Sequence, residues 1–529
     1  MTWHPTLVDT LLIMTRRCVG ITLMVCSLLA GCSSNSHVPR PDSGSDLQLR
    51  DSSLGDDRSL GDHSTSDDYP ALDDHPGALA EAGTDAPIGI DGGSTIVDAG
   101  YEVSVEAPTP ARRPNILVIL VDDLGYGDLS SYGAPDLKSP AVDKLAAEGM
   151  RFTDFHPNSP VCSPTRAALL TGRYPDLVGV PGVIRQWEDN TWGNLADDAI
   201  LLAQPLGEVG YHTAIVGKWH LGFEPPDTPL DRGFDFFHGF LADMMEDYYT
   251  HLRGGVNWMR LGRDEVNPVG HATDVFTDWA IEYLAARKNQ PEPFFLYLAY
   301  NAPHAPIQPP ADWLQRVLDR EPGISALRAP MVALVEHLDD GIRRVLQALE
   351  DNGQRDNTLI IFTSDNGGLV DLGSSNGPLR GQKGEMWEGG VRVPAVASWP
   401  GRIQSGTTSS AVFVTMDIFP TVLDAAGAMH AGELDGRSFL PVLLGKENAA
   451  PTRHLFFVRR EQPGGVYYGG RNGDYKLVQN VADGPFTLYN LSDDLAETTD
   501  LSASTPAAYS ELMSALEQHR LLADQVPWQ

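Results

Sequence analysis

Uninterrupted apolar runs, rather than alternating ones, mark the middle of the chain. Four of them stand out, at Ile116 to Val121, Thr213 to Val216, Phe294 to Tyr300 and Leu359 to Thr363. A strand without polar alternation is typical of a parallel sheet that is covered on both faces. Helical patterns separate these runs, for example from Ser139 to Gly149 and from Pro330 to Asn352. The pattern therefore predicts an α/β fold, with a large, mostly parallel mixed sheet flanked by helices.

Polar side chains follow two of the expected strands. Asp122 and Asp123 end the first run, and Ser364, Asp365 and Asn366 follow the last one. Binding sites in such sheets lie at the carboxyl ends of the strands, and these oxygen-bearing side chains suit a hard divalent cation such as Ca²⁺. For either pair alone, a helix cap or a turn is the commoner explanation. Because both pairs follow buried strands, a metal site is favoured.

The N-terminal region has a different composition. Arg16 and Arg17 precede an apolar run from Cys18 to Ala30, which is typical of a signal peptide and too short for a permanent membrane span. Met14 is an alternative start. The segment Leu29 to Cys32 resembles the bacterial lipoprotein box, so we expect residues 1–32 to be a lipoprotein signal peptide, with lipidation of Cys32. An ordinary signal peptide that is cut nearby is the alternative.

Residues 33–110 contain 16 acidic residues against three arginines and no sustained apolar period. Such a segment cannot bury enough apolar surface to offset its chain entropy, so we expect a disordered acidic tether. The whole chain of 529 residues carries a net charge of -33, which argues against a nucleic-acid partner. Together these features predict a lipid-anchored protein of the bacterial cell envelope, either periplasmic or on the outer membrane.

Cys162 is the one cysteine outside the targeting segment, which excludes disulfides from the mature chain. It stands at what the sequence predicts to be the first turn of a helix, with Arg166 one turn further on. A buried apolar cysteine is one reading. A helix N-terminus that binds an anion is another. A tyrosine-phosphatase loop is excluded, because it requires five residues between the cysteine and the arginine, and three are present here.

The stretch Cys162-Ser163-Pro164-Thr165-Arg166 resembles the sulfatase maturation motif, in which the cysteine is oxidised to Cα-formylglycine. Further stretches match this family in its order: TGRYP at 171–175, GYHTAIVGKWHLG at 210–222, NAPHAP at 301–306, TSDNGG at 363–368 and RGQKGEMWEGGVRVP at 380–394. Thr165 stands where many members have serine. The resemblance covers roughly residues 114–501 and implies the alkaline-phosphatase-like fold. It also implies a sulfuric ester hydrolase of the arylsulfatase type.

The resemblance assigns a task to each matching residue. The implied Ca²⁺ ligands are Asp122, Asp123, Cys162 as formylglycine, Asp365 and Asn366. The implied catalytic residues are Cys162, Arg166, Lys218, His220, His304 and Lys383, of which Lys218, His304 and Lys383 also bind the substrate. The formylglycine hydrate is expected to attack sulfur, with Asp365 as proton acceptor, and His220 to act as the base that releases sulfate. His304 and Lys383 are the candidates for protonating the leaving alcohol.

Beyond about Gly445 the pattern changes to short strands with turns, followed by a helix from about Thr505 to Ala523. This matches the small C-terminal antiparallel domain of sulfatases, whose acidic closing motif resembles LYNLSDDLAETTDL at 488–501. We therefore expect a catalytic domain at 111–445 and a small α+β domain at 446–529. We expect the substrate-selecting walls of the pocket in the loops at 179–198 and 243–267.

Two other functions remain open. One is a phosphatase or phosphonate hydrolase of the same superfamily, since a fold does not fix the substrate. The other is a catalytically silent lipoprotein that binds sulfated glycans, if Cys162 is never oxidised. For the sulfatase, the expected partners are a sulfate ester, most readily a sulfated glycan, and a formylglycine-generating maturation enzyme.

Overall fold

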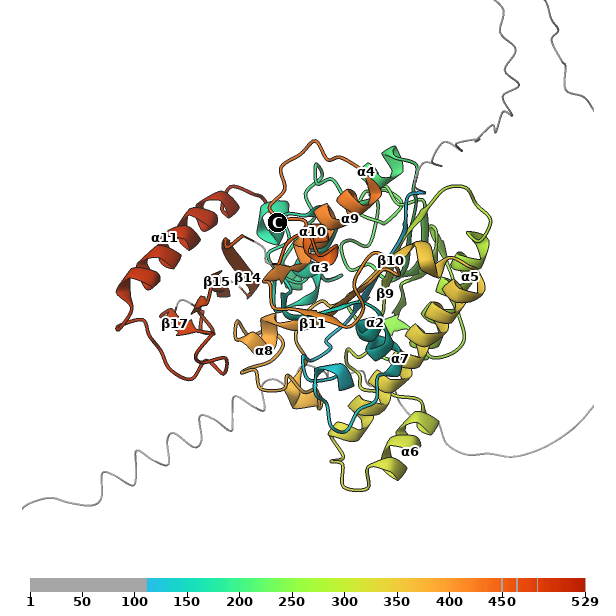
Figure 1. Ribbon diagram of the computed structural model, residues 1–529, viewed down its shortest axis with the longest axis horizontal. Helices are drawn as coiled ribbons and strands as arrows, with labels where there is room; N and C mark the ends of the chain where they lie inside the picture. The colour runs from blue at the N-terminus through green and yellow to red at the C-terminus, as the bar shows by residue number, and fades with distance from the viewer. Residues whose placement is uncertain (1–111, 449–450, 463–464, 483, 529) are drawn as a thin grey trace, which may run out of the picture. The chain divides into compact units, whose positions relative to one another are not determined.

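The computed structural model describes residues 112–448, 451–462, 465–482 and 484–528 (Figure 1). The expected signal peptide, Cys32 and the tether at 33–110 lie outside these residues, so they stay predictions. Within the described part of the chain, no helix has both the length and the apolar character needed to cross a bilayer.

A sheet of 11 strands forms the centre of the fold. Its middle consists of parallel strands in the order β10 (Thr358–Ser364), β1 (Asn115–Val121), β9 (Phe294–Ala299), β3 (His212–Lys218) and β4 (Phe236–Phe240). All seven residues of β1 are buried, as its apolar sequence predicts. The sheet is mixed, because strands on both sides of this block pair antiparallel. The expected mostly parallel α/β fold is confirmed.

The outer strands of the sheet were not predicted from the sequence. On one side lie β11 (Val393–Ser398), β2 (Met150–His156), β12 (Thr407–Ser409) and β13 (Phe413–Val414), and on the other lie β7 (Met259–Leu261) and β8 (Asp264–Glu265). A separate two-stranded ribbon is formed by β5 (Leu252–Arg253) and β6 (Val256–Asn257).

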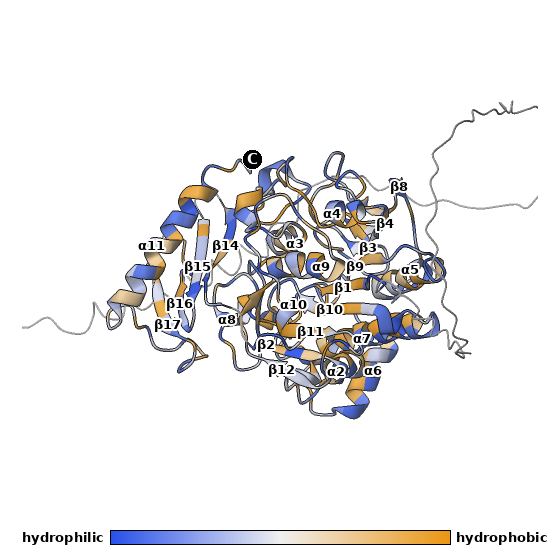
Figure 2. Cartoon of the chain, turned by 45° about the horizontal axis from the view of Figure 1, so that its top comes forward, coloured by the Kyte–Doolittle hydropathy of each residue, from blue (hydrophilic) through white to orange (hydrophobic). Residues whose placement is uncertain are grey.

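Helices cover both faces of the sheet. Ile116, Val118 and Leu120 of β1 join one apolar cluster, with residues of α3 (Cys162–Thr171), α4 (Ala203–Glu208), α9 (Ile418–Ala426) and α10 (Leu440–Leu443). The alternate residues of β1 join a second cluster, with α2 (Pro140–Glu148), α5 (Ala272–Ala286), α6 (Ala311–Arg320) and α7 (Arg328–Asp351). Figure 2 shows hydrophobic colour on β1, β9 and β10 between helices whose outer faces are hydrophilic.

A second, antiparallel sheet is built from the C-terminal part of the chain. It has the order β14 (His454–Gln462), β15 (Gly465–Asn472), β16 (Tyr475–Val478) and β17 (Thr487–Asn490), and α11 (Pro506–Ala523) packs against it. This confirms the expected α+β character of the C-terminal region. A buried ion pair from Lys476 of β16 to Glu388 of α8 (Glu388–Val391) connects this sheet to the segment that carries Lys383.

Candidate active site

The carboxyl ends of β1 and β10 place the predicted acidic residues side by side. The backbone N–H of Asp123 donates to Asp365 Oδ1 at 3.2 Å, and Asn366 Nδ2 donates to Asp123 Oδ1 at 2.8 Å. Asp123 has a φ of 68°, a left-handed conformation that non-glycine residues seldom adopt. Such strain is found where the surrounding structure holds a side chain in place for function.

Cys162 is the first residue of α3 and is buried. Its thiol donates to Asp122 Oδ1, with 3.4 Å between sulfur and oxygen. One turn along the helix, Arg166 donates to Asp365 Oδ2 at 3.1 Å from Nε and 2.6 Å from its terminal nitrogen. The arginine therefore lies against the carboxylates and fixes the start of the helix beside the ends of β1 and β10.

Lys218 and His220 come from the end of β3. Lys218 Nζ donates to Asp122 Oδ2 at 2.5 Å, and both side chains are fully buried. His220, at a φ of 61°, bonds through Nε2 to the carbonyl of Ile184 at 2.9 Å. Because a carbonyl only accepts, Nε2 carries the proton and Nδ1 presents a lone pair. This Nδ1 is buried and has no hydrogen-bond partner among the described residues.

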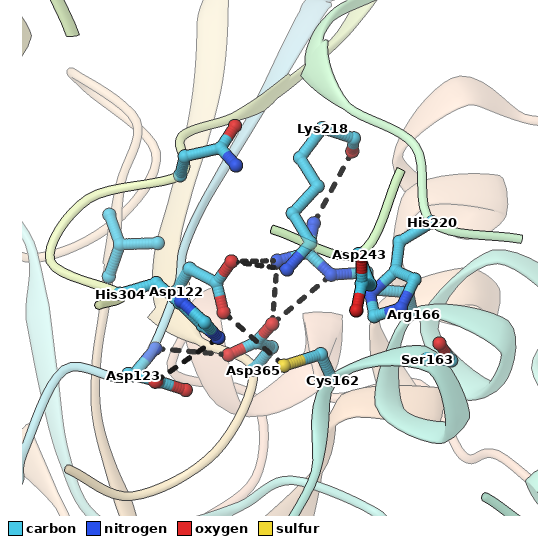
Figure 3. A network of polar contacts seen from close by, with 12 residues as sticks. Asp122, Asp123, Cys162, Ser163, Arg166, Lys218, His220, Asp243, His304 and Asp365 are labelled. Atoms are coloured by element: carbon cyan, nitrogen blue, oxygen red, sulfur yellow. Dashed lines mark hydrogen bonds and ion pairs between the residues drawn. The ribbon is translucent and has the colours of Figure 1, made fainter. Parts of the chain in front are cut away.

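Two loops complete the group from the other side. His304 Nδ1 donates to the carbonyl of Ala305 at 2.7 Å, which leaves Nε2 facing Asp123 Oδ2 at 3.6 Å. Lys383 Nζ lies 2.7 Å from Asp123 Oδ1. Figure 3 shows how Asp122, Asp123, Cys162, Arg166, Lys218 and His304 converge from these separate segments.

The charges of these groups shift one another's protonation. Burial alone would raise the pKa of Asp122, but Lys218, His304 and Arg166 outweigh it and hold that pKa well below its usual value. Burial and the neighbouring Asp122 raise the pKa of Asp365 to about 7, although Arg166 opposes this. The site thus holds three crowded carboxylates, one of which resists ionisation without further positive charge.

Burial, together with Asp122 and Asp365, raises the pKa of the Cys162 thiol well above its usual value. Burial, Lys218 and Arg166 lower the pKa of His220 well below its usual value, so that the ring is neutral. Burial and Lys383 also lower the pKa of His304. Burial works against the charge of Lys383, but Asp123 outweighs it and raises the pKa of this ammonium.

A cavity of about 350 Å³ opens above these residues. Cys162, His220, His304 and Lys383 line it, together with residues of the C-terminal sheet and of several loops. It is large enough for a sugar-sized group, and its floor presents the ammonium of Lys383, the imidazoles of His220 and His304 and the N-terminus of α3. Such a floor favours a tetrahedral oxyanion.

Comparison with known proteins identifies the family. The sulfatase family model matches residues 114–428, and the model described as N-sulphoglucosamine sulphohydrolase, C-terminal, matches residues 382–525. The chain is 36% identical to the N-acetylgalactosamine-6-sulfatase of Canis lupus familiaris, over 67% of this chain and 69% of that protein. The chain belongs to the sulfatase family. It is a sulfuric ester hydrolase, as its motifs led us to expect.

Two further relatives of this sulfatase cover more of its length. Human arylsulfatase A is 33% identical, over 79% of this chain and 89% of that protein. The crystal structure of Ps i-CgsB in complex with k-i-k-neocarrahexaose superposes with a TM-score of 0.71 at 32% identity, covering 77% of this chain and 92% of that one.

The residues of the sulfatase site fit a divalent cation. Ligand atoms of Asp122, Asp123, Cys162 and His304 lie within 4.8 Å of one another. Asn366 Oδ1 is buried and accepts no hydrogen bond from the described part of the chain. Oxygen donors dominate this set, which suits a hard ion. His304 was expected as a proton donor, and its position beside the carboxylates gives it a second possible task as a ligand.

All predicted site residues within the described chain gather at this one place. Some residues that line the cavity, however, were not predicted from the sequence. The expected loops contribute Val183, Arg185, Asp243, Met244 and Arg253 to the cavity. Arg459 and Glu461 of β14 also line it, and no motif pointed to them. The sequence there is an apolar run, Leu455 to Val458, followed directly by Arg459, Arg460 and Glu461, and this pattern does not mark a pocket wall.

Proposed function

We propose that this sulfatase hydrolyses a sulfate monoester of a carbohydrate, using a Cα-formylglycine made from Cys162 and a bound Ca²⁺. The observation that carries the proposal is the setting of Cys162: a buried thiol at the start of α3, 3.4 Å from Asp122, on the floor of a cationic cavity. A relative named for a sugar sulfate and a solved structure in complex with neocarrahexaose support the choice of substrate class.

The unmodified thiol is a poor nucleophile here. Only a thiolate attacks efficiently, and burial and two carboxylates keep Cys162 protonated. Conversion to formylglycine exchanges sulfur for oxygen and removes two electrons from Cβ, so it requires a maturation enzyme with an external electron acceptor. The hydrated aldehyde supplies one hydroxyl for attack on sulfur and a second whose deprotonation lets the sulfate leave.

Asp122, Asp123, Asp365 and Asn366 would hold the metal, with position 162 beside them. Bound Ca²⁺ would supply Lewis acidity toward a sulfate oxygen and the charge that keeps the carboxylates ionised. Arg166 holds Asp365 in place through two hydrogen bonds to one carboxylate oxygen.

Lys218 and Lys383 provide positive charge for the sulfate oxygens, since Lys218 is ion-paired with Asp122 and the neighbouring Asp123 raises the pKa of Lys383. His220 Nδ1 presents the lone pair of a neutral ring toward the site, which suits a base that removes a proton from position 162. His304 and Lys383, which both line the cavity, are the candidates for protonating the alcohol as it leaves.

The first experiment is mass spectrometry of the tryptic peptide Phe152 to Arg166, from protein made in its native host. Loss of the thiol with gain of an aldehyde at position 162 is the expected result. An intact thiol in well-folded, host-made protein would sink the formylglycine mechanism and favour a silent protein that binds sulfated glycans.

A second measurement separates the sulfatase from a phosphatase or phosphonate hydrolase. Turnover of 4-nitrophenyl sulfate is compared with that of 4-nitrophenyl phosphate and a phenyl phosphonate monoester. The proposal expects kcat/KM to be highest for the sulfate. A clear preference for either phosphorus ester would overturn the assignment of the substrate.

The place of action is proposed from the sequence alone. A lipid on Cys32 and the acidic segment at 33–110 would display the enzyme on the bacterial envelope. Labelling with a radioactive fatty acid, lost in Cys32→Ser, tests this proposal. Unchanged labelling in the variant, or none in the parent protein, would contradict it.

A further inference from the structure

A second cavity, of about 430 Å³, adjoins the catalytic one. The two share Arg185, which lines both, and are separated by two short stretches of chain. Val183 and His220 face the catalytic cavity, whereas Ile184 and Leu221 face the second one. The hydrogen bond from His220 Nε2 to the Ile184 carbonyl ties these stretches together. These two stretches therefore form a single layer of chain between the cavities, and the Arg185 guanidinium lies at its edge.

The second cavity, which we term the aromatic groove, has three partly exposed rings on its walls: Phe223, Trp258 and Trp528. The Phe223 and Trp258 rings pack together at 5.0 Å between centroids. Trp528 comes from the C-terminal end of the chain, where its ring lies 6.2 Å from that of Trp192 and beneath the Arg460 guanidinium. The groove thus combines elements that are distant in the sequence.

Polar groups stand among these rings. Glu188, Asn194, Glu224 and Asp227 also line the groove. Rings that offer an apolar face, mixed with carboxylates and amides, match a sugar, whose C–H faces are apolar and whose edge carries hydroxyls. No sulfate clamp is present among the residues that line it, so the groove differs in chemistry from the pocket beside it.

We propose that the aromatic groove binds the sugar units that follow the sulfated one, so that the substrate is a sulfated oligosaccharide or polysaccharide rather than a monosaccharide. This inference rests on the proposed function, because the sulfate ester must lie in the catalytic cavity. A chain attached to that ester leaves the cavity past Arg185 and enters the groove directly. The two cavities meet at Arg185, and this adjacency selects the occupant.

Arg185, where the catalytic cavity and the aromatic groove meet, is suited to contact a bound sugar chain. Its guanidinium lies 3.6 Å from Glu461 and 3.9 Å from Asp243, beyond hydrogen-bonding distance, and its contacts to Asn190 are long, at 3.4 and 3.5 Å. None of these contacts has the short, aligned geometry of a committed bidentate pair. Its donors can therefore turn to a hydroxyl or an acidic substituent of the bound chain.

The test measures affinity without turnover, in the Cys162→Ala background. Calorimetry compares N-acetylgalactosamine 6-sulfate with a chondroitin 6-sulfate hexasaccharide, and galactose 4-sulfate with an ι-carrageenan hexasaccharide. In at least one series the hexasaccharide is expected to bind about tenfold more tightly than its monosaccharide. Trp258→Ala and, separately, Trp528→Ala are expected to abolish most of this advantage.

Tyr249→Ala is the matched control, since this aromatic side chain is 45% exposed and lines neither cavity. It should keep the hexasaccharide advantage. Thermal melts identify a variant that fails to fold, and Trp528 at the chain end is the safer of the two substitutions. Two results would contradict the proposal that the aromatic groove binds sugar units. One is equal affinity for monosaccharide and hexasaccharide in both series, and the other is a hexasaccharide advantage that survives both tryptophan substitutions.

Failure of the proposed function gives a different result. If the parent protein releases sulfate from neither an aryl sulfate nor the sulfated sugars, the chemistry is wrong whatever the binding measurements show. If it hydrolyses aryl sulfate but binds both sugar lengths equally, the sulfatase assignment stands and the aromatic groove does not.

Discussion

At the scale of single residues, His220 combines an unusual backbone with an unpartnered nitrogen. Its φ of 61° turns the ring into the cavity, and the Ile184 carbonyl fixes the tautomer that leaves Nδ1 unprotonated. We expect His220→Ala to lower kcat by about 10²- to 10⁴-fold, the usual contribution of a general base. Steady-state kinetics with 4-nitrophenyl sulfate measures this effect.

The lowered pKa of His220 also predicts how kcat should depend on pH. Because the ring stays neutral well below pH 6.5, the base form is available in mildly acidic solution, and its protonation should not limit kcat near neutral pH. The control is His430→Ala, which replaces a less buried histidine that does not line the cavity. A kcat that is unchanged in His220→Ala would remove this residue from the mechanism.

His238 offers a test of stability rather than activity. Its ring stacks on Trp279, and burial lowers its pKa to about 4. In the unfolded chain the pKa is about 6.5, so the unfolded state takes up a proton first as the pH falls. The contribution of His238 to the free energy of unfolding is therefore present above pH 6.5 and lost toward pH 4.

His238→Phe keeps an aromatic ring against Trp279 and removes this titration. The melting temperature of the variant should rise relative to the parent protein as the pH falls from about 6.5 to 4. Differences between the two proteins are compared, so that other buried groups cancel. A difference that is constant with pH would show that the ring does not resist protonation.

Residues at strand ends were the ones that the sequence could predict. Asp122, Asp123 and Asp365 follow apolar runs, and the geometry of parallel strands brings such ends together. Lys218 was assigned only by the family motif that contains it. Cys162 was located by its motif and by the proline and arginine around it. Arg459 and Glu461 could not be found in this way, because they reach the cavity from a different sheet.

At the scale of elements, a buried ion cluster joins the C-terminal sheet to α8. Lys476 of β16 lies 2.7 Å from Glu388 and 3.0 Å from Glu497, and all three side chains are fully buried. Glu497 also accepts a hydrogen bond from Glu388 N, and its carbonyl accepts one from Arg380. The cluster thus holds the segment 380–388, which carries Lys383.

Lys476→Met should cost about 3–5 kcal/mol of unfolding free energy, because it leaves Glu497 buried without a cation and Glu388 with Arg392 alone. Arg316→Met, which breaks the exposed pair with Asp312, should cost less than about 1 kcal/mol. Denaturant unfolding at pH 8 measures both. Similar costs for the two variants would contradict the view that this cluster fastens the C-terminal sheet.

Elements were predicted to the extent that their own sequence marks them. β1, β9 and β10 were predicted as buried strands because their sequences are apolar on both faces. α2 was predicted as a helix because a proline stands at its start and a glycine at its end. β2 was missed, since its polar residues, such as Arg151 and Asp154, are satisfied only by distant partners. β11 contains Pro394, a residue that argues against a strand inside a sheet. Tertiary contacts, which no local pattern records, make these segments strands.

At the scale of the whole molecule, the metal site connects separate parts of the chain. Asp123, His304 and Asn366 come from segments far apart in the sequence, so a bound cation should stabilise the folded protein as a unit. Lys218 and Lys383 already neutralise two of the carboxylates. We therefore expect removal of the metal to lower the melting temperature without unfolding the protein.

Calcium at about 100 times its Kd should add about 2.7 kcal/mol to the free energy of unfolding. Scanning calorimetry of chelator-treated protein, with and without added Ca²⁺, measures the gain. Asp123→Asn should lose most of it, whereas Asp312→Asn, an exposed carboxylate far from the cavity lining, should keep it. Mg²⁺ should give a smaller gain, because it demands a tighter octahedron of ligands. A melting temperature that responds equally to calcium in both variants would place the ion elsewhere, and the crowded carboxylates at the ends of β1 and β10 would then need another source of positive charge.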